Sequence, residues 1–337
     1  MNMKSNYTKF KLLDLLRKKP MNFWELLAKN RFLLKDLIAT LNDLYSEGVI
    51  KIENEKIIVK NFKYRKNPEI KLCPCCNGKM IEISDEIKKI LPKFSEICKK
   101  RQKPNPEYFQ GYIIPEDVVG RVAFMEYYGD VSEKNILLIG DDDLLSICLC
   151  LTNLPKKVVV VDIDKNLGKF IEKMSKEHGL NIEFIEYDVS QPLPKELIGK
   201  FDVFSTEPLE TTSGFLAFLS RGIASLKQYG VGYIGLTVQE VSLKRWRKFQ
   251  ESILKSNFVI TDIAKEFSRY GDYEDYEDFA KELIFNPKKN PGVYWYKSAL
   301  FRIEALGKPC PLKKPEEKIK IKVVGAEDYT HPNFRKL

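Results

Sequence analysis

Acidic side chains follow four of the predicted strands, directly where each strand ends. They are Asp141, Asp142 and Asp143, which follow Gly140 after the first strand, Asp162 and Asp164 after the second, Asp188 after the third, and Glu207 and Glu210, on either side of Pro208 and Leu209, after the fourth. In open parallel sheets, ligands bind at the carboxyl ends of the strands where the strand order reverses. This accumulation of carboxylates therefore predicts a single crevice that binds cations.

Two of these acids fit a bound nucleoside. Asp162 lies about 20 residues beyond Gly140, which is the distance at which an acid reaches the ribose hydroxyls. Asp188 sits where adenosyl-binding folds place an acid that accepts a hydrogen bond from the adenine amino group. Either residue alone could be an exposed acid at a strand end, but the two together predict a nucleoside pocket.

The loop after the first strand lacks the glycines that normally cradle an anion. S-adenosylmethionine methyltransferases place a glycine-rich turn here, beside the methionine carboxylate, and dinucleotide enzymes place G-x-G-x-x-G here for pyrophosphate. Gly140 is instead followed at once by three carboxylates, which the N-terminus of the next helix can stabilise. They would repel an anion, since two like charges about 4 Å apart cost about 4 kcal/mol at an effective dielectric of about 20. We therefore expect a cationic ligand, and decarboxylated S-adenosylmethionine, which ends in an ammonium, meets this requirement.

The second substrate is also expected to be cationic. Glu207 and Glu210 enclose a proline turn at the point where amino-methylating enzymes carry their acceptor loop. The tract from Tyr270 to Glu282 interleaves tyrosines with acids, among them Asp272. Aromatic faces together with carboxylates hold alkylammonium groups well. The pattern equally fits a solvated acidic loop, and both interpretations stay open for this tract.

Alternating strands and helices over residues 111–305 must position these acids. Strands are expected at 135–140, 158–164, 181–189, 200–208, 230–238, 258–267 and 298–306, and helices at 144–154, 165–178, 214–227 and 243–254. This alternation predicts an α/β domain with a Rossmann-like, methyltransferase-type, doubly wound sheet. The two last strands follow each other closely, as at the reversed edge of the nucleoside-binding methyltransferase fold.

Residues 1–60 are predicted to form an N-terminal winged-helix domain. The expected elements are helices at 9–18, at 23–27 with Asn22 as the cap, and at 33–47, followed by a hairpin over 49–60 with a Glu-Asn-Glu turn. Many winged helices bind DNA through the third helix. Here that helix carries nearly balanced charges, which favours a dimerisation or substrate-capping module over DNA binding.

Residues 61–110 are predicted to be a polar connector with a cysteine cluster, and residues 306–337, rich in Lys and Pro, a flexible tail. Cys73 and Cys76 have the C-x-x-C spacing of half a zinc site, and Cys75 lies between them. A structural zinc needs four ligands, and the sequence has no second C-x-x-C. A partner subunit could complete such a half-site, or it could be a relic, and no metal is predicted.

Composition excludes several classes of protein. Of the 337 residues, 44% are hydrophobic, which suffices for a core and excludes a disordered chain. No apolar run approaches the roughly 20 residues of a membrane span, and the N-terminus does not resemble a secretory signal, so a cytoplasmic protein is expected. The net charge of +9 with only two His fits a heat-adapted proteome better than polyanion binding.

The run NILLIGDDDLLSI, the TEPLET loop, the winged-helix start and the C-P-x-C-like connector together resemble the archaeal and thermophile branched-chain polyamine synthases, the N4-bis(aminopropyl)spermidine synthases. The resemblance covers nearly the whole chain, and its specific part is the Gly-Asp-Asp-Asp motif at Gly140. It implies two successive aminopropyl transfers from decarboxylated S-adenosylmethionine to the internal secondary amine of spermidine, with release of 5′-methylthioadenosine. Glu207-Pro208-Leu209-Glu210 stands where Asp-Pro-Pro-Glu is expected, which affects the acceptor geometry but not its charge.

The resemblance implies a role for each candidate residue. Asp142, the central acid of the motif, would be the catalytic residue and accept the proton of the acceptor amine, directly or through water. The expected donor-binding residues are Gly140, Asp141, Asp143, Asp162, Asp164 and Asp188, and the expected acceptor-binding residues are Glu207, Pro208, Glu210, Tyr270 and Asp272. Asp141 or Asp143, together with Glu207, would also hold the flanking primary ammoniums. No cofactor is implied, since the donor is a co-substrate.

Two other functions remain as alternatives. One is an S-adenosylmethionine-dependent methyltransferase, which would need a first loop that tolerates a carboxylate. The other is a winged-helix regulator that senses a polyamine and binds DNA in a salt-dependent manner. The favoured interpretation has a small polyamine as its partner, no nucleic acid and no membrane, and a homodimer as the assembly.

Overall fold

The N-terminal part of the chain folds into three helices followed by a short antiparallel hairpin. The computed structural model describes residues 3–29, 33–64, 73, 78–271, 279–287 and 292–325. The elements of this part are α1 (Met3–Lys18), α2 (Phe23–Lys29), α3 (Leu34–Ser46), β1 (Ile50–Glu53) and β2 (Lys56–Val59). The predicted order of elements is confirmed, and the assignment to the winged-helix fold stays a prediction.

Local interactions explain why α2 and the hairpin form where they do. The Asn22 side chain accepts a hydrogen bond from the Glu25 N–H at 2.8 Å, and the Glu25 carboxylate accepts one from the Asn22 N–H at 2.9 Å. This reciprocal capping satisfies two backbone donors at the start of α2. Asn54 and Glu55 adopt φ angles of 49° and 61°, as a tight hairpin turn requires. The predicted cap and the predicted turn are both confirmed.

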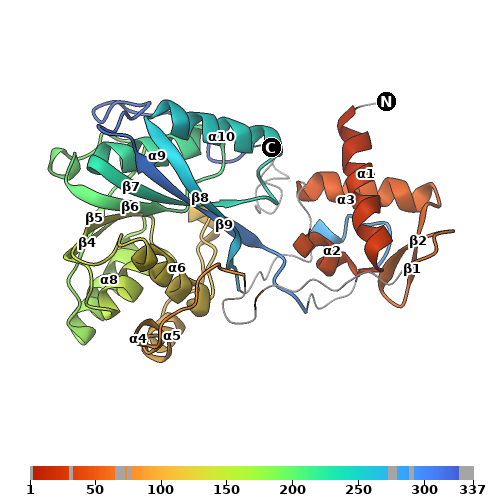
Figure 1. Cartoon of the computed structure of the whole chain (residues 1–337), viewed down its shortest axis with the longest axis horizontal. Coiled ribbons are helices and arrows are strands. Elements are labelled where there is room, and N and C mark those ends of the chain that lie inside the picture. The colour runs from red at the N-terminus through yellow and green to blue at the C-terminus, as the bar shows by residue number, and fades with distance from the viewer. Residues whose placement is uncertain are drawn as a thin grey trace.

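A twisted sheet of seven strands, with helices packed on it, makes up the larger part of the described chain (Figure 1). Its strands are β3 (Asn135–Ile139), β4 (Lys157–Asp162), β5 (Ile182–Glu186), β6 (Phe201–Thr206), β7 (Leu226–Thr237), β8 (Phe258–Arg269) and β9 (Lys297–Ala305). Their order is β5-β4-β3-β6-β7-β9-β8. The first five in this order are parallel, and β9 runs antiparallel to both β7 and β8. The predicted doubly wound sheet with a reversed edge is confirmed.

Helices cover both faces of the sheet, and each face has its own core. Figure 1 shows α9 (Thr212–Ser225) and α10 (Leu243–Lys255) on one face, and α6 (Pro115–Tyr127) and α8 (Lys165–His178) on the other. Strand side chains alternate between faces, so Ile136 and Leu138 of β3 join the core under α6 and α8, while Leu137 and Ile139 join the core under α9 and α10. Burial on both faces explains the continuous apolar runs of β3 and β4.

Two helices form within the predicted polar connector of residues 61–110, where the sequence prediction had none: α4 (Asp85–Lys88) and α5 (Leu91–Lys99). The prediction also missed α6, which follows the connector. Phe94 and Ile97 of α5 are fully buried in the core beside α6. All nine residues from Asp117 to Met125 of α6 are buried. The middle of this helix therefore has no polar stripe, and its sequence shows no amphipathic period that would predict it.

The N-terminal helices pack against the segment that leads into β9. Phe279, Leu283 and Trp295 share one core with residues of α2 and α3. The Asn42 side chain of α3 donates to the Glu282 carbonyl at 2.8 Å and accepts from the Ile284 N–H at 3.0 Å. Helix α3 is thus tied to the C-terminal half of the chain, which supports a packing or capping role for it.

Residues 312–325, the C-terminal strap, run along α9 from Ser220 to Ser213 instead of forming the flexible tail that their composition predicts. The reason is Arg221, a fully buried guanidinium that donates to the carbonyls of Lys314, Pro315 and Glu317 at 3.0, 3.1 and 2.6 Å. The Ile319 N–H also donates to the Ser190 carbonyl at 2.8 Å.

None of the described helices has the length and apolar character that a bilayer span requires.

Replacing Arg221 with Met should therefore loosen the strap. The change leaves these three carbonyls and that of Val189, to which Arg221 also donates at 3.2 Å, without their charged donor, and we expect the free energy of unfolding to fall by about 3 kcal/mol. Urea unfolding of wild type and variant measures this difference. Arg247→Met is the matched control: its guanidinium is largely exposed and pairs with Glu251 one helical turn away, so a change within about 0.5 kcal/mol is expected. Equal losses in the two variants would contradict the role of Arg221.

Candidate active site

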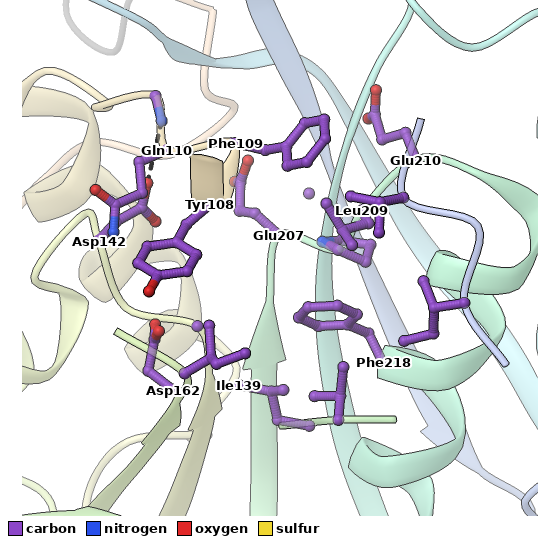
Figure 2. A pocket seen from close by; sticks show the side chains of 18 of the residues that line it. Tyr108, Phe109, Gln110, Ile139, Asp142, Asp162, Glu207, Leu209, Glu210 and Phe218 are labelled. Atoms are coloured by element: carbon purple, nitrogen blue, oxygen red, sulfur yellow. Dashed lines mark hydrogen bonds between the residues drawn. The ribbon is translucent and has the colours of Figure 1, made fainter. Parts of the chain in front are cut away.

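A cavity of about 590 Å³ lies at the carboxyl ends of the parallel strands. Nine of the predicted site residues line it: Gly140, Asp142, Asp143, Asp162, Asp188, Glu207, Pro208, Glu210 and Tyr270. Figure 2 shows Asp142 and Asp162 on one side of the cavity and Glu210, Leu209 and Phe218 on the other. The strand ends thus bring together residues that the sequence separates by up to about 130 positions, from Gly140 to Tyr270.

Two predicted site residues of the described part of the chain do not line this cavity. Asp141 and Asp164 lie behind its wall, where each makes internal hydrogen bonds. Asp272 lies outside the described residues, as do Cys75 and Cys76. Cys73 is exposed, and no group of three or more potential metal ligands occurs among the residues that the structure describes.

The turn after β3 places Asp142 and Asp143 against the backbone of residues 111–113. Gly140 has a left-handed φ of 78°, and the chain turns there into the acidic loop. The Asp142 carboxylate accepts a hydrogen bond from the Gly111 N–H at 3.1 Å, and Asp143 accepts one from the Ile113 N–H at 2.6 Å. Arg101 donates to the Asp142 carbonyl at 2.7 Å. The two acids therefore hold a second segment of the chain over the cavity.

Burial disfavours the ionised forms of Asp142 and Asp143. Burial, with the charges of Asp143 and Asp162 adding to it, raises the pKa of Asp142 well above its usual value. Burial and the nearby Glu207 raise the pKa of Asp143 to about 7. Asp143 is thus poised to exchange a proton near neutral pH, and Asp142 binds a proton more tightly than an ordinary aspartate, which suits acid–base chemistry.

The Asp141 carboxyl is held by the first turn of the helix that follows it. Its carboxyl accepts from the backbone N–H of Ser146, at 3.1 Å, and from the Ser146 hydroxyl, at the start of α7 (Leu145–Leu151). This is the expected stabilisation by the helix N-terminus, but it reaches only one acid of the three. Burial outweighs these donors and raises the pKa of Asp141 to about 8.

The acids after β4 and β5 are fixed by backbone donors. Asp162 accepts from the Asp164 N–H at 2.8 Å and from the Asp141 N–H at 3.2 Å, and burial raises its pKa. Asp188 accepts from the N–H and the hydroxyl of Ser190, at 2.8 and 2.7 Å. Asp164 caps α8 by accepting from the Asn166 N–H at 2.8 Å. Asp162 and Asp188 therefore present fixed carboxylates to the cavity, whereas Asp164 starts a helix.

Glu207 is paired with a buried arginine that the sequence did not single out. Its carboxylate accepts hydrogen bonds from Arg121 of α6 and from the Tyr270 hydroxyl, and Ser298 donates at 3.4 Å. Arg121 is only 3% exposed and also donates to the Ser268 hydroxyl at 2.9 Å. One charge of the acidic crevice is thus neutralised from within the protein.

A second acidic group lies at the end of β7. The Glu210 carboxyl accepts from the N–H and the hydroxyl of Thr237, and burial together with Glu240 and Glu207 raises its pKa to about 8. Glu240 also lines the cavity, and its carboxylate accepts from the Tyr296 hydroxyl at 3.3 Å. Sequence reasoning missed Glu240, although its place after a strand end is the same signal that identified the other acids.

Other lining residues had no sequence signal. Glu107, Tyr108, Phe109, Gln110 and Gly111 come from the segment before α6, and Ile319, Ile321 and Val323 come from the strap. Both segments are irregular, so no period in the sequence marks them. Together they provide apolar and aromatic walls opposite the strand ends.

Comparisons with known proteins agree with this geometry. Residues 89–329 match the family model described as the C-terminal domain of branched-chain polyamine synthase A. The chain is 38% identical over 293 residues to an N(4)-bis(aminopropyl)spermidine synthase of Thermococcus kodakarensis, covering 84% of this chain and 83% of the relative. It is 38% identical over 294 residues to the protein of the same name from Methanocaldococcus jannaschii, covering 85% and 84%.

A solved structure is similar over nearly the whole chain. It is a variant of the branched-chain polyamine synthase from Thermus thermophilus in complex with N4-aminopropylspermidine and 5′-methylthioadenosine. The TM-score is 0.84 at 29% identity, with 96% of this chain and 92% of that chain covered.

The raised pKa of Asp141 predicts how stability depends on pH. The folded protein keeps a proton that the unfolded chain loses near pH 4, so the free energy of unfolding falls as the pH rises toward the folded pKa of about 8. Asp141→Asn removes this dependence. Its stability relative to wild type should rise by up to about 1.4 kcal/mol per pH unit, as measured by urea unfolding between about pH 5 and about pH 8.

Asp202→Asn is the control, because Lys227 and Asn135 hold the pKa of Asp202 below its usual value. This acid is ionised in both states throughout that range, so the stability difference should stay constant. A constant difference for Asp141→Asn as well would show that Asp141 is ionised in the folded protein.

Proposed function

The chain belongs to the branched-chain polyamine synthase family, and we propose that it transfers aminopropyl groups from decarboxylated S-adenosylmethionine to the internal secondary amine of spermidine. The first transfer gives N4-aminopropylspermidine, the second gives N4-bis(aminopropyl)spermidine, and each releases 5′-methylthioadenosine. The relatives bear the name of this synthase, and the Thermus structure holds one polyamine and one nucleoside.

One observation supports the proposal for this chain. Asp142, a carboxyl with a raised pKa, lines the same cavity as Asp162 and Asp188 and as the acidic pair Glu207 and Glu210. Asp162 and Asp188 fit the ribose and adenine of the donor. Glu210 and Tyr270 fit the ammonium groups of the acceptor, because carboxylates and aromatic faces both attract cations. Glu207, whose charge Arg121 offsets, contributes to the acceptor side by holding the Tyr270 hydroxyl.

The chemistry asks mainly for alignment and one proton transfer. The sulfonium of the donor is already a good leaving group, so the protein must place a neutral nitrogen in line behind the propyl carbon. Spermidine is protonated in water, and Asp142 accepts the proton of its internal ammonium. The freed lone pair forms the new C–N bond, and the C–S electrons go to sulfur, which leaves as the neutral thioether 5′-methylthioadenosine.

The second transfer makes a different demand on the same carboxylate. A tertiary nitrogen becomes quaternary, and the product nitrogen carries no proton. The ionised Asp142 then stabilises the positive charge that develops on nitrogen. The raised pKa of Asp142 makes it a better proton acceptor in the first transfer. In the second transfer, the nearby positive charge of the substrates favours the ionised form of Asp142.

Asp142→Asn should separate catalysis from binding. The amide keeps the shape of the side chain but accepts no proton, so we expect turnover to fall by about 10³-fold. The affinity for 5′-methylthioadenosine should stay within about threefold, because Asp162 and Asp188 remain. Mass spectrometry of products made from decarboxylated S-adenosylmethionine and spermidine measures the first quantity, and calorimetry measures the second.

Asp262→Asn is the matched control, because Asp262 lies on β8, accepts from the Tyr128 hydroxyl and does not line the cavity. It should form both products at nearly the wild-type rate. Normal turnover in Asp142→Asn would remove Asp142 from the mechanism, and a wild-type protein that makes no aminopropylated product would remove the proposed function.

A further inference from the structure

Five consecutive residues, Glu107 to Gly111, line the cavity although they belong to no strand of the sheet. Residues 105–111 are called the cover segment below. Gly111 at its end is tied to the turn after β3 through the Asp142 carboxylate, at 3.1 Å. The cover segment therefore needs a second attachment if its side chains are to keep a fixed direction.

Gln110 supplies that attachment through both ends of its side-chain amide. Its Nε2 donates to Oδ2 of Asp164 at 2.8 Å, and its Oε1 accepts from the Asn105 N–H at 2.8 Å. The other carboxylate oxygen of Asp164 caps α8. One half-buried side chain thus fastens the cover segment to the first turn of a helix.

This attachment lies on the nucleoside side of the cavity. Asp164 follows β4 and donates its own N–H to Asp162 at 2.8 Å, so the chain of hydrogen bonds runs from Gln110 through Asp164 to the acid that fits the ribose. In Figure 2 the ring of Tyr108 is drawn between the carboxylates of Asp142 and Asp162.

The backbone conformation of the cover segment is held in place by the surrounding structure. Phe109 has a φ of 59°, which is rare for a bulky residue and persists only where the surroundings hold it. The left-handed turn at Phe109 separates its ring from that of Tyr108, and Figure 2 shows the two rings on opposite sides of Glu207. The fixed ends at Gln110 and Gly111 hold this turn.

We propose that Gln110 is a positioning residue for the donor: its hydrogen bond to Asp164 sets the cover segment so that Tyr108 contacts the nucleoside. The proposal rests on the proposed function for the identity of the nucleoside. Gln110 acts through Tyr108, and Asp164 serves as the anchor of the cover segment and not as a ligand of the donor.

Exchanging donor and acceptor across this hydrogen bond tests the proposal. Gln110→Glu sets a second carboxylate against Asp164, and the affinity for 5′-methylthioadenosine should fall by about tenfold through repulsion. In the double variant Gln110→Glu, Asp164→Asn the new amide can donate to the new carboxylate while its oxygen still caps α8. The affinity should return to within about threefold of wild type.

Calorimetry with 5′-methylthioadenosine and, separately, with N4-aminopropylspermidine provides the readout, and Gln228→Glu, an exposed change at the start of β7, is the matched control. Affinity for the polyamine should stay within about twofold in every variant. Three results would overturn the role of Gln110. They are an unchanged nucleoside affinity in Gln110→Glu, a loss of nucleoside affinity that persists in the double variant, and an equal loss of affinity for both ligands. A wild-type protein that binds no 5′-methylthioadenosine would overturn the proposed function as well, whereas the first three results leave it standing.

Discussion

The burial of several carboxyl groups at one edge of the sheet is the constraint on which the rest of the site depends. Asp141, Asp142 and Asp143 crowd one turn, and burial raises the pKa of all three. Without a ligand, Asp141 and Asp143 hold protons near neutral pH, because burial disfavours their charged forms and neighbouring negative charges add to this effect. A cation removes that penalty and an anion adds to it. Selectivity for cationic substrates thus follows from desolvation as much as from the number of acids.

The surrounding structure keeps this unfavourable cluster in place. Backbone N–H groups of residues 111 and 113 satisfy Asp142 and Asp143, and Ser146 satisfies Asp141. Arg121 neutralises Glu207 from the buried helix α6. The strap is held by Arg221, and the N-terminal helices hold the segment that leads into β9. Elements far apart in the sequence therefore close the cavity around the strand ends.

The sequence predicts the sheet well because each buried strand and each capped helix carries a local signal. Helix α8 was predicted at its observed bounds. The acids at the strand ends could be assigned to the site because ligands bind at the carboxyl ends of parallel strands. Arg121 and Gln110 could not be found in this way, because α6 is buried on all sides and the cover segment is irregular. Asp164 shows what the rule leaves out: an acid after a strand can also cap the next helix.

Calorimetric titration of the wild-type protein with decarboxylated S-adenosylmethionine and with S-adenosylmethionine tests the selectivity most directly. The two nucleosides differ by one carboxylate, which would have to approach the buried acids after β3. We expect the decarboxylated form to bind at least about 100-fold more tightly, since a repulsion of about 3 kcal/mol corresponds to such a ratio. Equal or tighter binding of S-adenosylmethionine would contradict the view that buried carboxyls have replaced the anion cradle of this fold.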